Sequence, residues 1–441
     1  MFENRDELAS GPRAAMRKDA MDILRAGVDA VEPYTSVTDF VRREGDDLTV
    51  GDRHYDLDAV DRVIVLGGGK AAIAMVTAVV DLLGDKAGGH VNALEDRTVG
   101  EVACHRATHP IPGPEGVEGS RLMFEAARDA TGRDLVLCLI SGGGSALMPL
   151  PEQGLTLGDK MEMTDILLRC GATIQELNCV RKHMSAIKGG KLARAASPAP
   201  VASLILSDVI GDPLDSIASG PTAPDTTTYA DARAILKRYG VWDRAPDAVR
   251  RELEAARFET PKEGDPLFDG VENVLIGNNM KSQVAMVHRA LQLGYVGVQL
   301  EDYLLGNNRE AAVEFLDAAR GFTGGEARAV VVGGGETTVV VTGSGRGGRN
   351  QEMALVNMGR LGEGELFASL GTDGVDGKSH AAGAMVDTGI METARERGLD
   401  PGDFLAENDS TSFFERAGGL LVTGPTGTNV ADVQLYMVTR E

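Results

Sequence analysis

Four glycine-rich segments could bind phosphate through their backbone amides. They are GGGK (67–70), SGGGS (141–145), GGGET (333–337) and GRGGRN (345–350). Glycine lacks a side chain, so the N–H groups of such segments can approach phosphate oxygens closely. The sequence has neither the P-loop pattern GxxxxGK[ST] nor a clean GxGxxG after a strand, which disfavours a Walker-type enzyme and a dinucleotide site. One cluster alone is often a tight turn, but several near expected strand and helix ends favour a phosphate-containing ligand.

Cationic side chains accompany these segments. Lys70 opens the helix expected after the first one, where a cation opposes the helix dipole unless an anion lies nearby. In the helix expected at 176–195, Arg181, Ser185 and Lys188 share one face, and Gly189 and Gly190 then interrupt it. A cationic face is unexpected in so acidic a chain, so Arg181 is predicted to hold phosphate or carboxylate. A solvated lysine or an ion pair with a nearby acid is the alternative for the lysines.

Carboxylates follow two of the expected strands. Asp208 and Asp212 come after the apolar run VASLIL, and Asp373 and Asp376 flank a glycine. Such carboxylates suit Mg²⁺ carried by nucleotide phosphates, or a general base for a substrate hydroxyl. Helix capping and turn formation are the alternative roles. His109 lies in a proline-stiffened segment, where a structural role is favoured over a catalytic one.

Apolar runs alternate with amphipathic helices, which predicts an α/β fold with a mostly parallel sheet covered on both faces. The expected elements are a helix at 12–31, a strand, glycine turn and helix at 61–84, strands at 133–151 and 201–212, a strand, loop, helix and strand at 271–302, a strand, turn and strand at 327–345, a helix near 349–360 and a strand at 364–377. Ligands of such sheets bind beyond the carboxyl ends of the strands, where the glycines gather here. The expected hairpin near 329–342 indicates a mixed sheet in the second half.

The length of 441 residues exceeds the usual size of one hydrophobic core, so two domains are expected. The polar stretch at 257–270 has little hydrophobic periodicity and is the expected boundary. We therefore predict an N-terminal domain at 1–260 and a C-terminal domain at 261–441.

The charge balance narrows the classes of function. The net charge is −22, with 66 acidic residues against 44 basic ones, so nucleic acid and anionic membranes are disfavoured as partners. The chain lacks an apolar run of membrane-spanning length, and its N-terminus is unlike a signal peptide. The four cysteines form no CxxC pair, which favours a reducing cytoplasm. Arginine outnumbers lysine 33 to 11, and we favour a high-salt cytoplasm over an ordinary one.

Motifs along almost the whole chain carry a family resemblance. They are LGGGKAA (66–72), THPIPGP (108–114), ISGGGSALMPLP (140–151), LNCVRKHMSAIKGGKLA (177–193), LSDVIGDPLDSIASGPTAPD (206–225), GRGGRNQEMAL (345–355) and GTDGVDGKSHAAGAMVD (371–387). Their order and spacing resemble the glycerate 2-kinases that have a C-terminal MOFRL domain. One departure is Lys378, Ser379 and His380, where that family often has a proline and an acidic residue.

The resemblance implies an N-terminal Rossmann-like three-layer α/β/α sandwich and a smaller C-terminal α/β domain with a mixed sheet, with the active site in the cleft. It also implies ATP, a divalent metal such as Mg²⁺, and D-glycerate as the acceptor, giving 2-phosphoglycerate. Lys70 and Arg181 correspond to family site residues, as do Arg349 and Asn350 of the GGRNQE motif. Asp208 and Asp373 are carried over with them.

The resemblance and the local chemistry together give the expected site. The catalytic residues are Lys70, Arg181, Asp208 and Arg349. Substrate binding is expected of Lys70, Ser141, Arg181 and Arg349. Nucleotide binding is expected of Gly142, Gly143, Gly144, Ser145, Gly335, Glu336, Thr337 and Asn350, and metal binding of Asp208 and Asp373.

Two other functions remain open. Some members of the resembling family are named hydroxypyruvate reductases, which would use NADH or NADPH, although the sequence has no convincing nicotinamide fingerprint. A non-catalytic protein that binds a sugar acid or a nucleotide is the other alternative. The sequence leaves the oligomeric state open, with a homodimer as one possibility.

Overall fold

The computed structural model describes residues 1–11 and 13–440 and divides into two compact units. One unit is Pro33–Ile276, and the other combines Met1–Glu32 with Gly277–Glu441. This division differs from the single boundary expected at 260/261, because the N-terminal helix packs with the C-terminal segment. A hydrogen bond of 2.7 Å from the Tyr295 hydroxyl to Asp19 joins these distant parts of the sequence. Each unit is described separately below.

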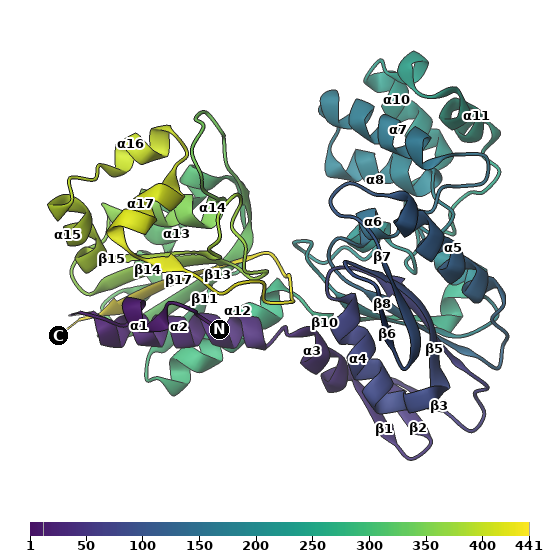
Figure 1. Cartoon of the computed structure of the whole chain (residues 1–441), viewed down its shortest axis with the longest axis horizontal. Coiled ribbons are helices and arrows are strands. Elements are labelled where there is room, and N and C mark those ends of the chain that lie inside the picture. The colour runs from purple at the N-terminus through teal and green to yellow at the C-terminus, as the bar shows by residue number, and fades with distance from the viewer. Residues whose placement is uncertain (12, 441) are drawn as a thin grey trace. The chain divides into compact units, whose positions relative to one another are not determined.

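The unit Pro33–Ile276 is built on a seven-stranded sheet (Figure 1). Its strands, in sheet order, are β10 (Val271–Gly277), β9 (Val201–Leu206), β8 (Leu135–Ile140), β4 (Val63–Gly68), β5 (Ala87–Ala93), β7 (Glu101–Arg106) and β6 (Arg97–Val99). Strands β9, β8, β4, β5 and β7 pair in parallel, whereas the edge strand β6 is antiparallel to β7. The predicted, mostly parallel sheet is confirmed.

Helices cover both faces of this sheet. Side chains alternate between the faces of a strand. Ile64 and Leu66 of β4 share a core with Met123 of α5 (Pro114–Arg128) and Leu192 of α9 (Lys191–Ala196). Helix α4 (Ala72–Leu83) packs on β4 and β5 as well, and the preceding α3 (Pro33–Phe40) packs on α4. The arrangement is the three-layer α/β/α sandwich implied by the resemblance.

Two smaller groups complete this unit. A three-stranded antiparallel sheet consists of β1 (Val41–Glu44), β2 (Asp47–Val50) and β3 (Arg53–Asp56). A helical group with its own apolar core consists of α7 (Leu157–Arg169), α8 (Ile174–His183), α10 (Tyr229–Arg238) and α11 (Asp247–Ala255) (Figure 1). The helical group holds Arg181, so its packing positions one of the expected site residues.

The second unit contains a mixed sheet. Its strands, in sheet order, are β11 (Val296–Gln299), β13 (Arg328–Thr338), β17 (Asp432–Thr439), β14 (Glu365–Gly371), β15 (Gly383–Asp387) and β16 (Leu420–Leu421), with β12 (Leu304–Asn307) also paired to β13. Strand β17 is antiparallel to both β13 and β14, whereas β11 and β12 are parallel to β13. The mixed sheet implied for the C-terminal domain is confirmed.

Helices also cover both faces of the mixed sheet. Figure 1 shows α2 (Ala14–Asp29) and α12 (Asn279–Gln292) on one face and α13 (Asn308–Thr323) and α14 (Arg349–Met358) on the other. The remaining helices of the unit are α1 (Arg5–Leu8), α15 (Thr388–Glu396), α16 (Pro401–Ala406) and α17 (Ser410–Ala417). Position 12, the start of the predicted N-terminal helix, lies outside the described residues. Among the described residues, none forms a helix long and apolar enough to cross a membrane.

The hairpin predicted near 329–342 is wrong, because β13 runs unbroken through its glycines. A Cβ atom on Gly334 would lie 1.9 Å from the side-chain oxygen of Asn279, and one on Gly335 would lie 2.1 Å from the carbonyl oxygen of Leu304. The glycines therefore allow close packing inside the sheet and do not form a turn.

The helix predicted over 176–195 is interrupted. Helix α8 ends at His183, and α9 begins only at Lys191. In between, the Ser185 hydroxyl donates to the carbonyl oxygen of Leu150 at 3.0 Å, and Gly190 has a φ of +77°. Ser185 and Lys188 therefore do not continue the helical face of Arg181, and the argument from helical spacing fails.

Candidate functional site

The loops at the carboxyl ends of β4 and β8 are tied together. The backbone N–H of Lys70 donates to the carbonyl oxygen of Gly142 at 2.9 Å. The next N–H, of Ala71, donates to the hydroxyl of Ser141 at 3.2 Å. Ser141 is 1% exposed, so its hydroxyl supports the loop of Lys70. These contacts fix the point at which the Lys70 side chain leaves the sheet.

Four expected site residues, Lys70, Gly142, Gly143 and Asp208, come together at this edge. A Cβ atom on Gly143 would lie 3.2 Å from Cγ of Lys70 and 3.1 Å from Cδ2 of His109. A Cβ atom on Gly142 would lie 2.4 Å from Oδ2 of Asp208. Burial and the positive charge of Lys70 lower the pKa of His109. Lys70 and Asp208 are thus neighbours of the same glycine loop, as the sheet-edge argument predicts.

A cavity of about 530 Å³ opens beside this loop. Its polar lining includes Lys160, Arg181, Lys188, His109, Gly143 and Ser145. An apolar wall includes Ile111, Leu157, Met161 and Leu168. The cavity therefore offers a cationic region and an apolar region to one ligand.

The lysines of this cavity are buried without a carboxylate partner. Nζ of Lys188 donates to the carbonyl oxygen of Ser145 at 2.9 Å. Nζ of Lys160 donates to the carbonyl oxygens of Pro149 and Leu150, at 2.9 and 3.2 Å. Lys160 is 7% exposed and Lys188 is 2% exposed. Within the part of the chain that the structure describes, neither ammonium group nor the Arg181 guanidinium pairs with an acid.

Burial makes the charged forms of these groups unfavourable. Burial, Lys191 and Arg181 lower the pKa of Lys160 to about 7, although Glu152 acts in the opposite direction. Burial, Lys160 and Arg181 hold the pKa of Lys188 well below its ordinary value. Burial lowers the pKa of Arg181 to about 10. A cluster of mutually repelling cations in a cavity is favourable only when an anion is bound among them.

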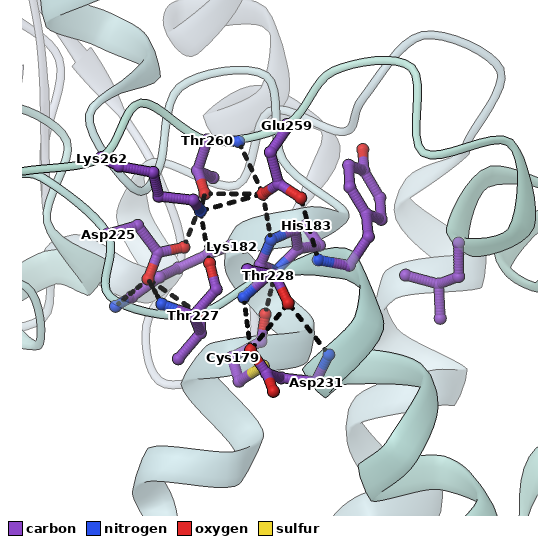
Figure 2. A network of polar contacts seen from close by, with 12 residues as sticks. Cys179, Lys182, His183, Asp225, Thr227, Thr228, Asp231, Glu259, Thr260 and Lys262 are labelled. Atoms are coloured by element: carbon purple, nitrogen blue, oxygen red, sulfur yellow. Dashed lines mark hydrogen bonds and ion pairs between the residues drawn. The ribbon is translucent and has the colours of Figure 1, made fainter. Parts of the chain in front are cut away.

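Figure 2 shows a network of polar contacts at the end of α8, around Lys182 and His183, which follow Arg181 in the sequence. The ring of His183 bonds the carbonyl oxygen of Cys179 at 2.7 Å and Oε1 of Glu259 at 3.0 Å. Lys182 pairs with Asp215 at 2.8 Å and with Asp225 at 3.1 Å. Lys182 therefore anchors the helix, while Arg181 on the same turn faces the cavity.

A strained turn holds the Lys188 loop. The N–H of Gly189 donates to the carbonyl oxygen of Ser219 at 3.0 Å, and the N–H of Gly190 donates to that of Gly220 at 2.7 Å. Ser219 and its neighbour Ala218 have φ values of +63° and +51°, which non-glycine residues adopt at a cost. The Ser219 hydroxyl also bonds that of Ser145 at 2.9 Å. The strained residues beside the cavity thus help to position Lys188 and Ser145.

Gly144 has a packing role. It begins the short helix α6 (Gly144–Leu147) and is buried. A Cβ atom there would lie 2.8 Å from that of Ala218. Of the glycines expected to bind nucleotide in this loop, only Gly143 lines the cavity itself.

In the other unit, Arg349 is neutralised by carboxylates. It forms a two-pronged ion pair with Asp432 and a second pair with Glu336 at 3.0 Å. Burial opposes the charged form, but these carboxylates raise the pKa of Arg349. Asn350 donates from its amide to Asp432 at 3.0 Å and accepts from the Ser369 hydroxyl at 2.5 Å. Arg349 and Asn350 are thus adjacent to one buried carboxylate.

A buried carboxylate accepts hydrogen bonds from backbone amides at the start of α14, next to the glycine segment. The N–H groups of Asn350 and Gln351 donate to the carboxylate of Asp376, at 3.0 and 2.8 Å. A Cβ atom on Gly348 would strike that carboxylate at 2.2 Å. Burial raises the pKa of Asp376 to about 6. A protein carboxylate therefore occupies the position at which the sequence predicted a ligand phosphate.

The other expected residues of this unit are dispersed. Gly335 is buried within β13, and Glu336 is exposed and paired to Arg349. The Thr337 hydroxyl donates to the side-chain oxygen of Asn308 at 2.7 Å. Oδ1 of Asp373 accepts from the N–H of Val375 at 3.1 Å. Gly335 thus lies in a strand and Thr337 bonds Asn308, and nucleotide binding by this segment stays a prediction.

Sequence reasoning missed two residues with strong electrostatic roles. Lys160 lies three and seven residues before Met163 and Leu167, which are buried, so its position belongs to the buried face of α7. The hydrophobic periodicity of the sequence could therefore have identified Lys160 as a buried lysine. Asp432 lies far along the chain from Arg349, and no local pattern marks it.

The carboxylates expected to bind metal suit a magnesium ion that arrives with a nucleotide better than a metal ion held by protein ligands alone. Within the described ranges, no group of three or more His, Cys, Asp or Glu side chains could hold a metal. Mg²⁺ commonly takes one or two carboxylates together with phosphate oxygens and water. Asp208, beside Gly142 at the sheet edge, suits that role. Asp373 lies in the other unit.

Comparisons with known proteins cover almost the whole chain. Residues 19–254 match the family described as "Domain of unknown function (DUF4147)", and residues 329–432 match the MOFRL family. A glycerate 2-kinase of Pyrococcus horikoshii is 38% identical, covering 95% of this chain and 98% of that protein. A protein of Agrobacterium vitis, named as a candidate hydroxypyruvate reductase, is 40% identical over 86% of this chain and 87% of its own. The crystal structure of a glycerate kinase from Thermotoga maritima matches with a TM-score of 0.85 at 36% identity, covering 96% of this chain and 99% of that one.

Proposed function

Because this chain belongs to the glycerate kinase family with a MOFRL domain, we propose that it transfers the γ-phosphoryl group of ATP to the 2-hydroxyl of D-glycerate. The products would be 2-phosphoglycerate and ADP. The ATP dependence and the choice of the 2-hydroxyl are the parts of this proposal that go beyond family membership.

The observation that carries the proposal is the cluster of buried cations beside the glycine loop. Lys160, Arg181 and Lys188 line one cavity, and burial depresses the pKa of each. An anion with several negative oxygens, such as a nucleotide triphosphate or a phosphorylated acid, would favour the charged forms of these groups. Phosphoryl transfer depends mainly on such positioning and charge neutralisation.

We assign roles according to position. Lys160 and Lys188 bind phosphate oxygens of ATP, and the apolar wall around Met161 suits an aromatic base. Lys70 and Arg181 hold the glycerate carboxylate and the transferring phosphoryl group. Asp208 accepts the proton of the 2-hydroxyl as its oxygen forms the new bond to phosphorus and ADP leaves.

Mg²⁺, when bound with the nucleotide, would offset negative charge on the phosphate oxygens, and Asp208 is the carboxylate at the sheet edge that would hold it. Asp208 thus has two proposed roles, as metal ligand and as proton acceptor. Substitution by asparagine separates them, because the amide still offers an oxygen to a metal but accepts a proton poorly.

Arg349 and Asn350 are assigned to substrate and nucleotide through the family resemblance. Their own unit supports a positioning role for the carboxylates that hold them. If Arg349 binds substrate, Asp432 orients its guanidinium. The assignment of Gly335, Glu336, Thr337 and Asp373 rests on the sequence alone.

The cellular setting completes the proposal. A net charge of −22 with 66 acidic residues suits a high-salt cytoplasm, where screening reduces repulsion between like charges. Activity should therefore persist, or increase, in molar salt. Sedimentation of the purified chain would decide whether it forms a homodimer.

A coupled assay tests the reaction. The purified chain with Mg-ATP and D-glycerate should release ADP, and phosphorus NMR should show phosphate on the 2-position. ADP release with no glycerate dependence would contradict the proposal, and phosphate on the 3-position would refute the regiochemistry. The relative from Agrobacterium vitis motivates the reductase alternative. Oxidation of NADH or NADPH by hydroxypyruvate, seen as an absorbance change, would favour that reading.

A further inference from the structure

A second cavity in the unit Pro33–Ile276 is lined by basic side chains. Its volume is about 770 Å³. The basic residues of its lining are Arg121, Arg128, Lys191, Arg194 and Arg257. Among the described residues that line it, only Glu152 is acidic. Such a concentration of positive charge is unusual in a chain with 66 acidic and 44 basic residues.

Two of these guanidinium groups lack a carboxylate partner. Arg194 donates to the carbonyl oxygen of Glu259 at 2.7 Å, and its side chain extends from α9. Arg128, at the end of α5, is exposed and pairs with no acid among the residues described here. By contrast, Arg121 and Arg257 each have carboxylate partners, which lie outside the cavity lining.

A buried lysine also lines this cavity. Lys191 is 3% exposed and donates to Oε2 of Glu152 at 2.8 Å and to the carbonyl oxygen of Ser185 at 2.9 Å. Burial lowers the pKa of Lys191, while Glu152 acts in the opposite direction. The rings of Phe124 and Phe258 add apolar surface to the lining. The cavity thus combines one buried ammonium, two unpaired guanidinium groups and apolar contacts.

We propose that this second cavity binds a small multivalent anion, a polycarboxylic or phosphorylated metabolite, separately from the reaction site. Guanidinium groups bind carboxylate and phosphate through paired hydrogen bonds, and several of them favour a ligand with more than one anionic group. The volume is sufficient for a metabolite of that size. Nucleic acid is disfavoured by the net charge of −22.

Neighbouring residues of the same two segments line the two cavities. Pro149 lines the first cavity and Leu150 the second, on consecutive positions of one segment. Lys188 lines the first and Lys191 the second, on one turn of chain. A β-bridge between Pro151 and Ser185 joins the two segments. An anion in the second cavity therefore adds negative charge beside the cations of the first, and should weaken nucleotide binding there. This coupling, unlike the binding itself, rests on the proposed kinase function.

Calorimetric titration with citrate tests the site. We compare the wild type with Arg128→Gln/Arg194→Gln, which removes the two unpaired charges, and with Lys188→Met, which alters only the first cavity. Arg251→Gln is the matched control, because Arg251 is an exposed arginine of the same unit outside both cavities. The double variant should bind citrate about tenfold or more weakly. Arg251→Gln should bind as the wild type does, and Lys188→Met should lose much less affinity than the double variant. A titration of the Lys188→Met variant with pyrophosphate tests whether phosphate anions bind in the same cavity.

Two results would overturn the site: citrate binding that is unchanged in the double variant, or binding that is abolished in Lys188→Met. Unchanged thermal unfolding of the double variant would show that it is folded. Kinetics test the coupling separately: citrate should raise the KM for ATP in the wild type and leave it unchanged in the double variant. Equal responses of the two proteins would refute the coupling, and the titration remains decisive even if the chain has no kinase activity.

Discussion

In the unit Pro33–Ile276, Lys160 and Lys188 are buried and donate only to carbonyl oxygens, whereas in the other unit Arg349 is held by Asp432 and Glu336. Arg349 follows a glycine-rich motif, whereas Lys188 precedes Gly189 and Gly190 and Lys160 lies within the helix α7. Burial depresses the pKa of the lysines. The carboxylates have the opposite effect on Arg349.

This difference in pairing indicates that the two groups of cations have different roles. A cation that is already paired stabilises the fold and can position its neighbours. A buried cation without a counterion destabilises the empty protein, and an arriving anion relieves that destabilisation. We therefore expect substitutions in the first group to affect ligand binding and turnover, and substitutions in the second to affect folding first.

The largest effect is expected from Lys188→Met. Methionine keeps the length of the side chain but removes the charge that would stabilise the phosphates, and kcat/KM should fall about 10³-fold. Lys237→Met is the matched control, because Lys237 is an exposed lysine of the same unit and should retain full activity. Steady-state kinetics on both variants provide the measurement. Near-normal turnover of Lys188→Met would remove Lys188 from the site.

Arg349→Met should cost about 3–5 kcal/mol of the free energy of unfolding, because it leaves the buried carboxylate of Asp432 without its cation. Urea denaturation measures this cost. The double variant Arg349→Met/Asp432→Asn removes both charges and should recover much of the loss. If Arg349→Met is as stable as the wild type, the contrast between the two units is mistaken.

The pH dependence of anion binding sharpens the comparison. In the free protein the pKa of Lys160 is about 7, and a bound anion favours its charged form and raises that pKa. Below pH ~7, Lys160 is charged in the free and in the anion-bound protein, so its contribution to affinity is constant. Above that pH, Lys160 must take up a proton when the anion binds, and the affinity should fall by up to about tenfold per pH unit. Sulfate suits the titration because its charge is constant in this range. Lys160→Met should flatten the profile, and an unchanged slope in that variant would assign the proton to another group.

The same shift has a consequence for the empty protein. The pKa of Lys160 is lower in the folded chain than in the unfolded one, so the unfolded chain binds more protons between pH ~7 and ~10. The contribution of Lys160 to the free energy of unfolding should therefore rise as the pH increases from ~7 to ~10. Thermal unfolding of the wild type and of Lys160→Met, measured across the window, isolates the contribution.

The smallest effect is expected at a positioning residue. Glu259→Gln weakens the contact that orients His183 at the end of α8, so the KM for ATP should rise a few-fold while kcat changes little. Glu252→Gln is the matched control, because Glu252 bonds Tyr229 as Glu259 does but does not contact His183. Equal KM values for the two variants would show that the network in Figure 2 has only a structural role.

The sequence predicted the sheet edge well. The run of residues before Lys70 and its glycines define the strand β4, the turn and the helix α4, and the rule for parallel sheets predicted that Asp208 and the 141–145 loop would lie nearby. These features depend on local patterns and on general topology. They could therefore be derived before any coordinates.

Other features depend on distant parts of the chain. The glycines of β13 resemble a loop until Asn279 and Leu304 are seen to pack against them. Arg181 and Lys188 do line one cavity, but through an irregular loop and not through helical spacing. The carboxylate of Asp376 at the start of α14 could not be inferred, because no local pattern links it to Gln351.

The most direct test of the central claim is the free energy of unfolding of Lys188→Met in the absence of any ligand. If Lys188 is held without a counterion until an anion binds, removing its amine should stabilise the empty protein, by about 1–4 kcal/mol. A variant that is less stable than the wild type would show that Lys188 is already satisfied by its surroundings, and the cavity would then lose its claim to be the anion site.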